Sequence, residues 1–250
     1  MRTKQFFITI AIICIVSLFL TNSVYGYPWI SPYSYCMNNP VRYVDPTGET
    51  VKPSDEEALK MIQNTLTKED MQYVRFDENG NIDKDYLNSH TSESGNYGSL
   101  LELVNSDIIT EVSLASGFSY MDNNGNMQEV KEMSYQGPDP EFADPTGSTI
   151  GGTTTGEAGL MGQTLLPGKG TSGRNSPDNT IKVIMNVNLS PAARAEMYSH
   201  EANGHALMFV RTGDRVKSGH IIIGSTDTNT PLVNMIKSSK METVINMLKP

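Results

Sequence analysis

The sequence has little cysteine. It contains 2 cysteines in 250 residues, and one of them, Cys14, lies in an apolar segment near the start of the chain. If that segment is removed on export, Cys36 remains alone, so no internal disulfide can form and a zinc site built from several cysteines is excluded. Any metal site must therefore take its ligands from His, Asp or Glu.

Positive charge is also scarce. The chain has 19 Lys and Arg against 28 Asp and Glu, which gives a formal net charge of −9 at pH 7. Proteins that bind nucleic acids draw most of their affinity from Lys and Arg side chains that neutralise phosphates. The composition therefore predicts no nucleic-acid partner.

The first 26 residues have the layout of a secretory signal peptide. Arg2 and Lys4 precede a mostly apolar run at 6–20, and residues 24–26 offer a cleavage site. The run is shorter than the roughly 20 apolar residues of a bilayer span. We predict export to the periplasm, the cell surface or the medium. An uncleaved N-terminal anchor is the alternative, and it is the only membrane attachment we expect.

Two histidines and a glutamate, His200, Glu201 and His205, fall within six residues. A His-Glu pair followed by a second His is typical of single-zinc hydrolases, because a helix can aim both imidazoles at one ion while the glutamate reaches the water. We predict that His200 and His205 bind Zn²⁺ and that Glu201 is the general base. The alternative is that both are ordinary helix residues without a metal.

The spacing of these histidines does not suit a regular helix. At about 100° per residue, positions five apart point about 140° away from each other, whereas positions four apart differ by about 40°. Both side chains can reach one ion only if the helix contains a one-residue π-bulge or ends before His205. Gly204 supplies the backbone freedom for either. We therefore predict a distorted or terminated helix at residues 203–204.

Two residues are candidates for the third protein ligand. Glu242 lies on a predicted C-terminal helix at about 231–248, beside the small side chains Ser238 and Ser239. His220 follows a glycine-containing turn and precedes a short apolar run. We predict Glu242, with His220 as the alternative ligand and neither residue as a third possibility. Three protein ligands would leave the fourth position for water.

Residues 33–48 read YSYCMNNPVRYVDPTG. This stretch resembles the end of the RHS-repeat core, Y-x-Y-x-x-N-N-P-x-x-Y-x-D-P-x-G, which precedes a variable C-terminal toxin domain. Residues 200–206 resemble the H-E-x-x-G-H-A element of metallopeptidase-type domains found behind such cores. The resemblance implies an RHS core remnant at 27–50 and a toxin-type metallopeptidase domain at 51–250. It also implies a protein or peptide substrate and an immunity protein as partner.

The expected fold is α+β and zincin-like, with a small, mostly antiparallel sheet, an active-site helix and a C-terminal helix. Turns at 79–80 and 124–125 predict two β-hairpins. A strand at 180–187 precedes the helix start Ser190-Pro191. Residues 136–179 are rich in Gly, Thr, Ser and Pro, which predicts one long loop.

Two other functions remain open. A toxin nuclease could use the same histidines around another metal, although the acidic charge disfavours it. A non-catalytic secreted interaction protein is the third possibility. Zinc content and hydrolysis of proteins, DNA and RNA would separate the three functions.

Overall fold

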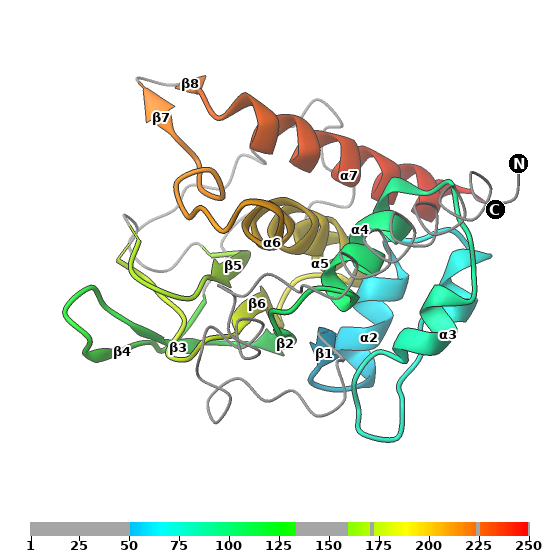
Figure 1. The fold of residues 1–250 in the computed structure, drawn as a ribbon, viewed down its shortest axis with the longest axis horizontal. Helices are drawn as coiled ribbons and strands as arrows, with labels where there is room; N and C mark the ends of the chain where they lie inside the picture. The colour runs from blue at the N-terminus through cyan, green and yellow to red at the C-terminus, as the bar shows by residue number, and fades with distance from the viewer. Residues whose placement is uncertain (1–50, 134–159, 171–172, 224–225, 250) are drawn as a thin grey trace, which may run out of the picture. The chain divides into compact units, whose positions relative to one another are not determined.

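The computed structural model describes residues 51–133, 160–170, 173–223 and 226–249 (Figure 1). The predicted signal peptide at 1–26 and the RHS-like segment at 27–50 lie outside the described residues. Among the described helices, none is both long and apolar enough to cross a membrane.

The elements follow in chain order. They are β1 (Val51–Pro53), α2 (Glu56–Gln63), a 3-10 turn (Asp70–Tyr73), α3 (Lys84–Asn88), α4 (Gly95–Val104), β2 (Thr110–Ala115), β3 (Phe118–Met121), β4 (Met127–Val130), β5 (Gly162–Leu165), β6 (Ile181–Asn186), α5 (Pro191–His200), a π-helical turn (Glu201–Ala206), α6 (Leu207–Thr212), β7 (Ile222–Ile223), β8 (Thr226–Asp227) and α7 (Thr230–Leu248). The predicted strand at 180–187 and the predicted C-terminal helix are thus confirmed.

The main sheet has four strands in the order β1-β2-β6-β5. Strands β1, β2 and β6 are parallel, and β5 is antiparallel to β6. The hairpins β3–β4 and β7–β8 form two separate antiparallel pairs. The α+β class is confirmed, but the expectation of a mostly antiparallel sheet is wrong for the main sheet. Helices α2, α3 and α4 lie between β1 and β2 in the chain, and crossovers of this kind join parallel strands.

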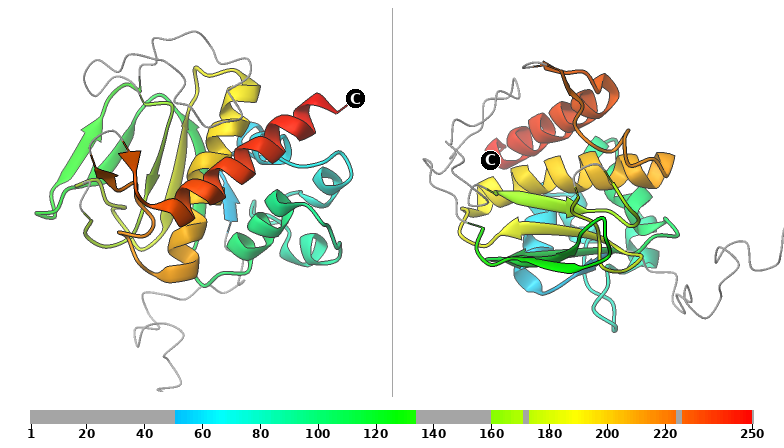
Figure 2. Two further views of the ribbon diagram at one scale, coloured as in Figure 1. Left: turned by 90° about the horizontal axis from the view of Figure 1, so that it is seen from above. Right: turned by 90° about the vertical axis from the view of Figure 1, so that its left-hand side faces the viewer.

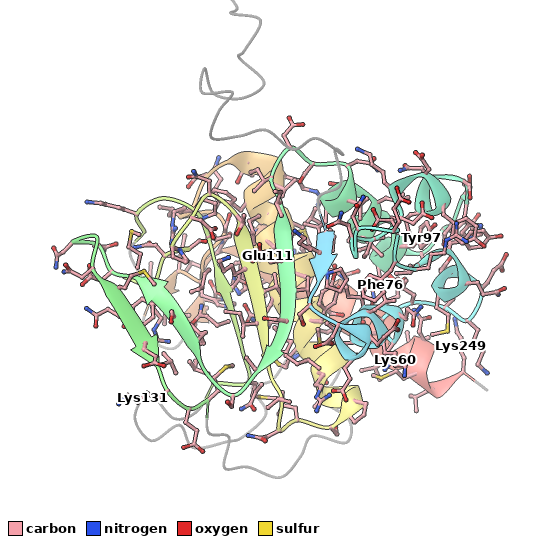
Figure 3. All side chains as sticks on the ribbon, turned by 90° about the horizontal axis from the view of Figure 1, so that it is seen from below. Lys60, Phe76, Tyr97, Glu111, Lys131 and Lys249 are labelled. Carbon is pink, nitrogen blue, oxygen red and sulfur yellow. The ribbon has the colours of Figure 1, made fainter. Side chains whose placement is uncertain are left out.

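The side chains of the main sheet alternate between two apolar clusters. Val183 and Met185 of β6 pack in the larger cluster with the helices, whereas Ile184 between them packs in a smaller cluster with Phe118. The sheet, the α5–α6 segment and α7 form successive layers (Figure 2). Figure 3 views the domain from the sheet side and labels Glu111 of β2. The α5–α6 segment is therefore covered on both sides, as a rigid support for a site requires.

Two predicted elements differ from the structure. The chain forms only a single bridge, Phe76 to Ile82, around the turn at 79–80 and then enters α3, because the Asp83 side chain accepts from the backbone N–H of Tyr86 and caps that helix. The hairpin around 124–125 is confirmed as β3–β4. The predicted loop at 136–179 contains β5, which pairs with β6. Of that predicted loop, residues 136–159 and 171–172 lie outside the described ranges.

Candidate metal centre

The helix that begins after β6 is well specified locally. Ser190 caps it by accepting from the backbone N–H of Ala193 at 3.3 Å, and Pro191 occupies its first turn. At Glu201 the α-helical pattern changes to a π-helical turn, and α6 then continues the same helix to Thr212. The predicted distortion at 203–204 is therefore confirmed, in its π-helical form.

Gly204 has a second role in this turn. A Cβ atom at this position would lie 2.5 Å from Cγ1 of Ile236 on α7. Any side chain at 204 would thus push α7 away from the turn. The glycine permits close packing of α7 as well as the change of helical pitch.

The π-helical turn brings His205 beside His200, and the loop after α6 adds His220. Nε2 of His205 lies 3.1 Å from Nε2 of His200, and Nε2 of His220 lies 3.3 Å from the same atom. The three residues each offer a ligand atom within 4.8 Å of the others. Three nitrogens at about 2.0–2.1 Å from one tetrahedral zinc ion would be about 3.3–3.4 Å apart. The two distances from His200 Nε2 are close to this value, and the third pair of ligand atoms lies within 4.8 Å, so the three histidines are close enough to bind one metal ion.

In His205 and His220, the hydrogen bond made by Nδ1 determines which ring nitrogen carries a proton. Nδ1 of His205 faces the carbonyl of Ser218 at 2.6 Å, and Nδ1 of His220 faces the Asp227 carboxylate. Both partners only accept hydrogen bonds, so each Nδ1 carries a proton and the Nε2 of the neutral ring presents a lone pair. A proton on Nε2 of His200 could form a hydrogen bond with the Nε2 lone pair of only one of these two rings. A cation in the centre would satisfy all three rings.

The electrostatic environment keeps His200 neutral. Burial lowers the pKa of His200 well below its ordinary value, and the nearby His205, His220 and Lys240 act in the same direction. Lys240 is itself paired at 2.7 Å with the buried Glu196, one turn before His200. A neutral imidazole is the form that binds a metal, so this histidine is ready to do so near pH 7.

Glu201 lies beside the imidazoles in a cavity of about 450 Å³. Its side chain is 7% exposed, and the Thr164 hydroxyl lies 2.7 Å from its Oε2 and 3.1 Å from its backbone carbonyl. The cavity is lined by Gly162, Gln163, Thr164, Leu166, His200, Glu201, His205, Arg215, Ser218, Gly219 and His220. A carboxylate next to a set of metal ligands can move protons during hydrolysis.

The prediction of Glu242 as third ligand is wrong in the structure. Its Oε1 accepts from the Ser94 hydroxyl at 2.5 Å and its Oε2 accepts from the backbone N–H of Asn96 at 3.2 Å. The carboxylate thus stabilises the N-terminus of α4. The neighbouring Ser239 contacts Asn96 of α4 and Asn203 of the π-helical turn. The alternative, His220, completes the cluster.

Three residues that support the candidate centre were not predicted from the sequence. Asp227 follows His220 by seven residues, and a carboxylate so near a candidate ligand could have been considered as its partner. Ser218 contributes only a backbone carbonyl to His205, which no side-chain pattern reveals. Thr164 lies in the segment without apolar periodicity, so nothing in the sequence linked it to Glu201.

Comparison of the chain with protein-family models, with curated proteins and with solved structures finds no match. The chemistry of the site therefore follows from its own residues and their geometry.

Proposed function

We propose that the chain is a zinc-dependent peptidase in which His200, His205 and His220 hold the ion and Glu201 is the general base. One observation carries this proposal. The Nε2 atoms of His205 and His220 each lie within 3.3 Å of Nε2 of His200, close to the separation of two zinc ligands, beside a buried glutamate that lines the same cavity. A zincin-like arrangement of the fold belongs to the same proposal.

The catalytic roles follow from the positions of these groups in the cavity. A bound zinc ion would supply a Lewis acid that polarises a peptide carbonyl and makes water more acidic. Glu201 accepts a proton from the attacking water and donates it to the leaving amine. The Thr164 hydroxyl holds Oε2 of this carboxylate, while Oε1 has no hydrogen-bond partner among the described residues and would be the oxygen that takes the proton.

The edge strand β5 supports a peptide as substrate. Among the described residues it is the terminal strand of the main sheet and pairs with β6 on one side only. Its residues Gly162, Gln163 and Thr164 line the cavity. An extended peptide can pair with a free strand edge through its backbone. A protein or peptide substrate would then lie along β5 with a peptide bond beside the imidazoles.

We further propose that the peptidase is an exported, RHS-associated effector that an immunity protein neutralises. The supporting observations are the resemblance of residues 33–48 to the end of an RHS core and the signal-like composition of residues 1–26. Both segments lie outside the described residues.

The proposal is tested by measuring zinc content and hydrolysis of an unfolded protein substrate. The wild type should hold one zinc ion per chain and hydrolyse the substrate. His200→Ala should lose the zinc. Glu201→Gln should keep the zinc and lose about 10²–10⁴-fold in hydrolysis, which is the usual contribution of a general base.

His90 offers a matched control. It is the one histidine of the four outside the cluster, stacked on Tyr73 at 4.0 Å and bonded to Asp70 at 3.0 Å. His90→Ala should keep both zinc and hydrolysis. A wild type without stoichiometric zinc, or a Glu201→Gln variant with full hydrolysis, contradicts the proposal. Cleavage of DNA or RNA that requires His200 would indicate the nuclease instead.

A further inference from the structure

The loop between α6 and β7 supplies two parts of the candidate centre. Its Ser218 carbonyl holds the ring of His205, and the loop also carries His220. Within the loop, the hydroxyl and the backbone N–H of Ser218 donate to the carbonyl of Asp214 at 2.7 and 3.1 Å. A residue that fixes this loop in place therefore acts on two of the three imidazoles.

Arg215 connects the loop to the other side of the cavity. Its Nη1 donates to the carbonyls of Leu166, Pro167 and Gly168 at 2.5, 2.9 and 2.7 Å. Its Nη2 lies 3.4 Å from the carbonyl of Arg174. These carbonyls follow β5, the strand that carries Thr164. Arg215 thus links the loop that carries His220 to the segment that follows β5. The Thr164 hydroxyl of β5 is hydrogen-bonded to Glu201.

The contacts of Arg215 differ from those of a surface arginine. Arg211, for example, pairs with the Glu102 carboxylate at 2.6 Å, whereas the partners of Arg215 are backbone carbonyls. Burial partly removes the guanidinium charge from water and so lowers the pKa of Arg215. The dipoles of the surrounding carbonyls balance this charge. The planar guanidinium presents several donors at once, which a lysine ammonium cannot reproduce at the same positions.

The space for this guanidinium depends on the residue at position 170. A Cβ atom on Gly170 would lie 2.3 Å from Nε and 2.4 Å from Nη2 of Arg215. A side chain there would displace the guanidinium. A second substitution can therefore disturb the same contact while the arginine itself remains.

We propose that Arg215 is a positioning residue of the metal centre. It holds the loop at 213–220 against the end of β5, so that the Ser218 carbonyl and His220 stay in place relative to His200. The proposal rests on the zinc site proposed above, and it adds that zinc affinity depends on a residue that touches no metal ligand through its side chain.

The test compares zinc affinity, measured by competition with a chromogenic chelator, in the full chain and its variants. Arg215→Lys and Gly170→Ala should each weaken zinc binding about 10–100-fold, the usual effect of losing a residue that orients metal ligands. The visible spectrum of the Co²⁺-loaded variants should change as the ligand geometry relaxes. Arg211→Lys and Gly98→Ala are the matched controls, since a Cβ at Gly98 meets nothing within 4 Å, and both should bind zinc as the wild type does.

Thermal unfolding of the metal-free variants separates positioning from general stability. A merely structural arginine would lower the unfolding temperature and leave the affinity and the Co²⁺ spectrum of the folded chain unchanged. That result, or wild-type zinc affinity in both Arg215→Lys and Gly170→Ala, overturns the inference. If the wild type binds zinc but hydrolyses no peptide, the proposed peptidase fails while the affinity measurements still decide the role of Arg215. A wild type that binds no zinc overturns both.

Discussion

Two clusters of polar side chains share one stretch of helix. The first, which we call the interhelical network, joins α4, α5, the π-helical turn and α7 through Asn96, Ser199, Asn203, Ser239 and Thr243. The second, the histidine centre, consists of His200, His205 and His220. Neighbouring residues of the same chain segment, Ser199 and His200, thus serve different clusters.

The interhelical network pairs donors with acceptors. Asn96 Nδ2 donates to the Thr243 hydroxyl at 2.9 Å, and the Ser239 hydroxyl donates to Asn96 Oδ1 at 2.6 Å. Ser199 and Thr243 share a hydrogen bond of 2.6 Å. Within the described residues, Asn203 Oδ1 is the one buried side-chain atom of the network without a partner. Apart from this atom, the side chains of the network satisfy one another, and their hydrogen bonds hold the helices together.

The histidine centre instead turns atoms of the same kind toward one another. Its Nε2 atoms converge while the Nδ1 atoms of His205 and His220 are occupied by acceptors. Lone pairs that face each other in a cavity are stabilised only by a proton or a cation. The difference teaches that the candidate metal site is recognised by polar atoms without complementary partners. A cluster of polar side chains whose donors and acceptors are paired does not indicate such a site. The predictions below test this contrast, from the largest expected effect to the smallest.

His205→Ala should have the largest effect. Loss of one of the three proposed ligands should weaken zinc binding by at least about 10³-fold, because only two histidines of the cluster then remain. The free energy of unfolding of the metal-free chain should change little, since the ring is only partly buried. Isothermal titration with zinc and urea unfolding check both statements. A large loss of metal-free stability would show that the histidine centre is also structural.

Asn96→Ala should show the reverse pattern. Its amide donates to the carbonyls of Thr65 and Ser239 as well as to Thr243, so its removal leaves several buried groups unsatisfied. We expect a loss of about 3 kcal/mol in the free energy of unfolding. Zinc affinity of the folded chain should stay within about twofold, because Asn96 touches none of the three imidazoles. A parallel loss of affinity would mean that the two clusters are coupled.

Asp227→Asn should weaken zinc binding about 10–100-fold. The carboxylate holds Nδ1 of His220, and such partners raise the basicity of a ligand and orient its ring. Burial alone would raise the pKa of Asp227, but hydrogen bonds from the backbone N–H of Asn229 and from His220 outweigh it and lower the pKa. Chelator competition measures the affinity. An unchanged value would remove Asp227 from the centre.

Thr164→Val should affect catalysis without affecting the metal. The substitution keeps the shape of the side chain and removes the hydroxyl that bonds Glu201 Oε2. We expect unchanged zinc affinity and a kcat lower by about 3–10-fold, which corresponds to one hydrogen bond of about 1 kcal/mol. Steady-state kinetics and zinc titration on the same preparation separate these effects. A loss of zinc would place Thr164 with the ligands.

Acid should destabilise a third region that belongs to neither cluster. Burial alone would raise the pKa of Asp178, but hydrogen bonds from Thr180 and Lys182 lower it to about 2. Because this folded-state pKa is below the unfolded value of about 3.9, the stabilisation is fully present above that value and is lost as pH falls toward 2. The carboxylate is 49% exposed, so we expect only about 1 kcal/mol. Asp178→Asn should remove this part of the pH dependence in urea unfolding between about pH 5 and pH 2.

Local features of the chain were predictable to different extents. The Ser190 cap and strand β6 follow from short-range patterns and appear where expected. Strand β5 was not predictable, because its pairing partner β6 lies about twenty residues away and its own composition has no alternation. Helix α3 was missed because a side-chain cap at Asp83 prevailed over an apparent strand pattern.

The sequence by itself determined where the helix that carries His200 and His205 must depart from regular geometry. Two positions five residues apart cannot share one face of a regular helix, so a zinc site at His200 and His205 requires a distortion, which the structure has as a π-helical turn. Only the tertiary structure decided which residue joins these two histidines. Glu242 and His220 both follow the motif, and their choice depends on which segment folds back over the cavity. That depends on contacts between distant residues, such as Glu242 with the start of α4 and Asp227 with His220, which no local pattern encodes.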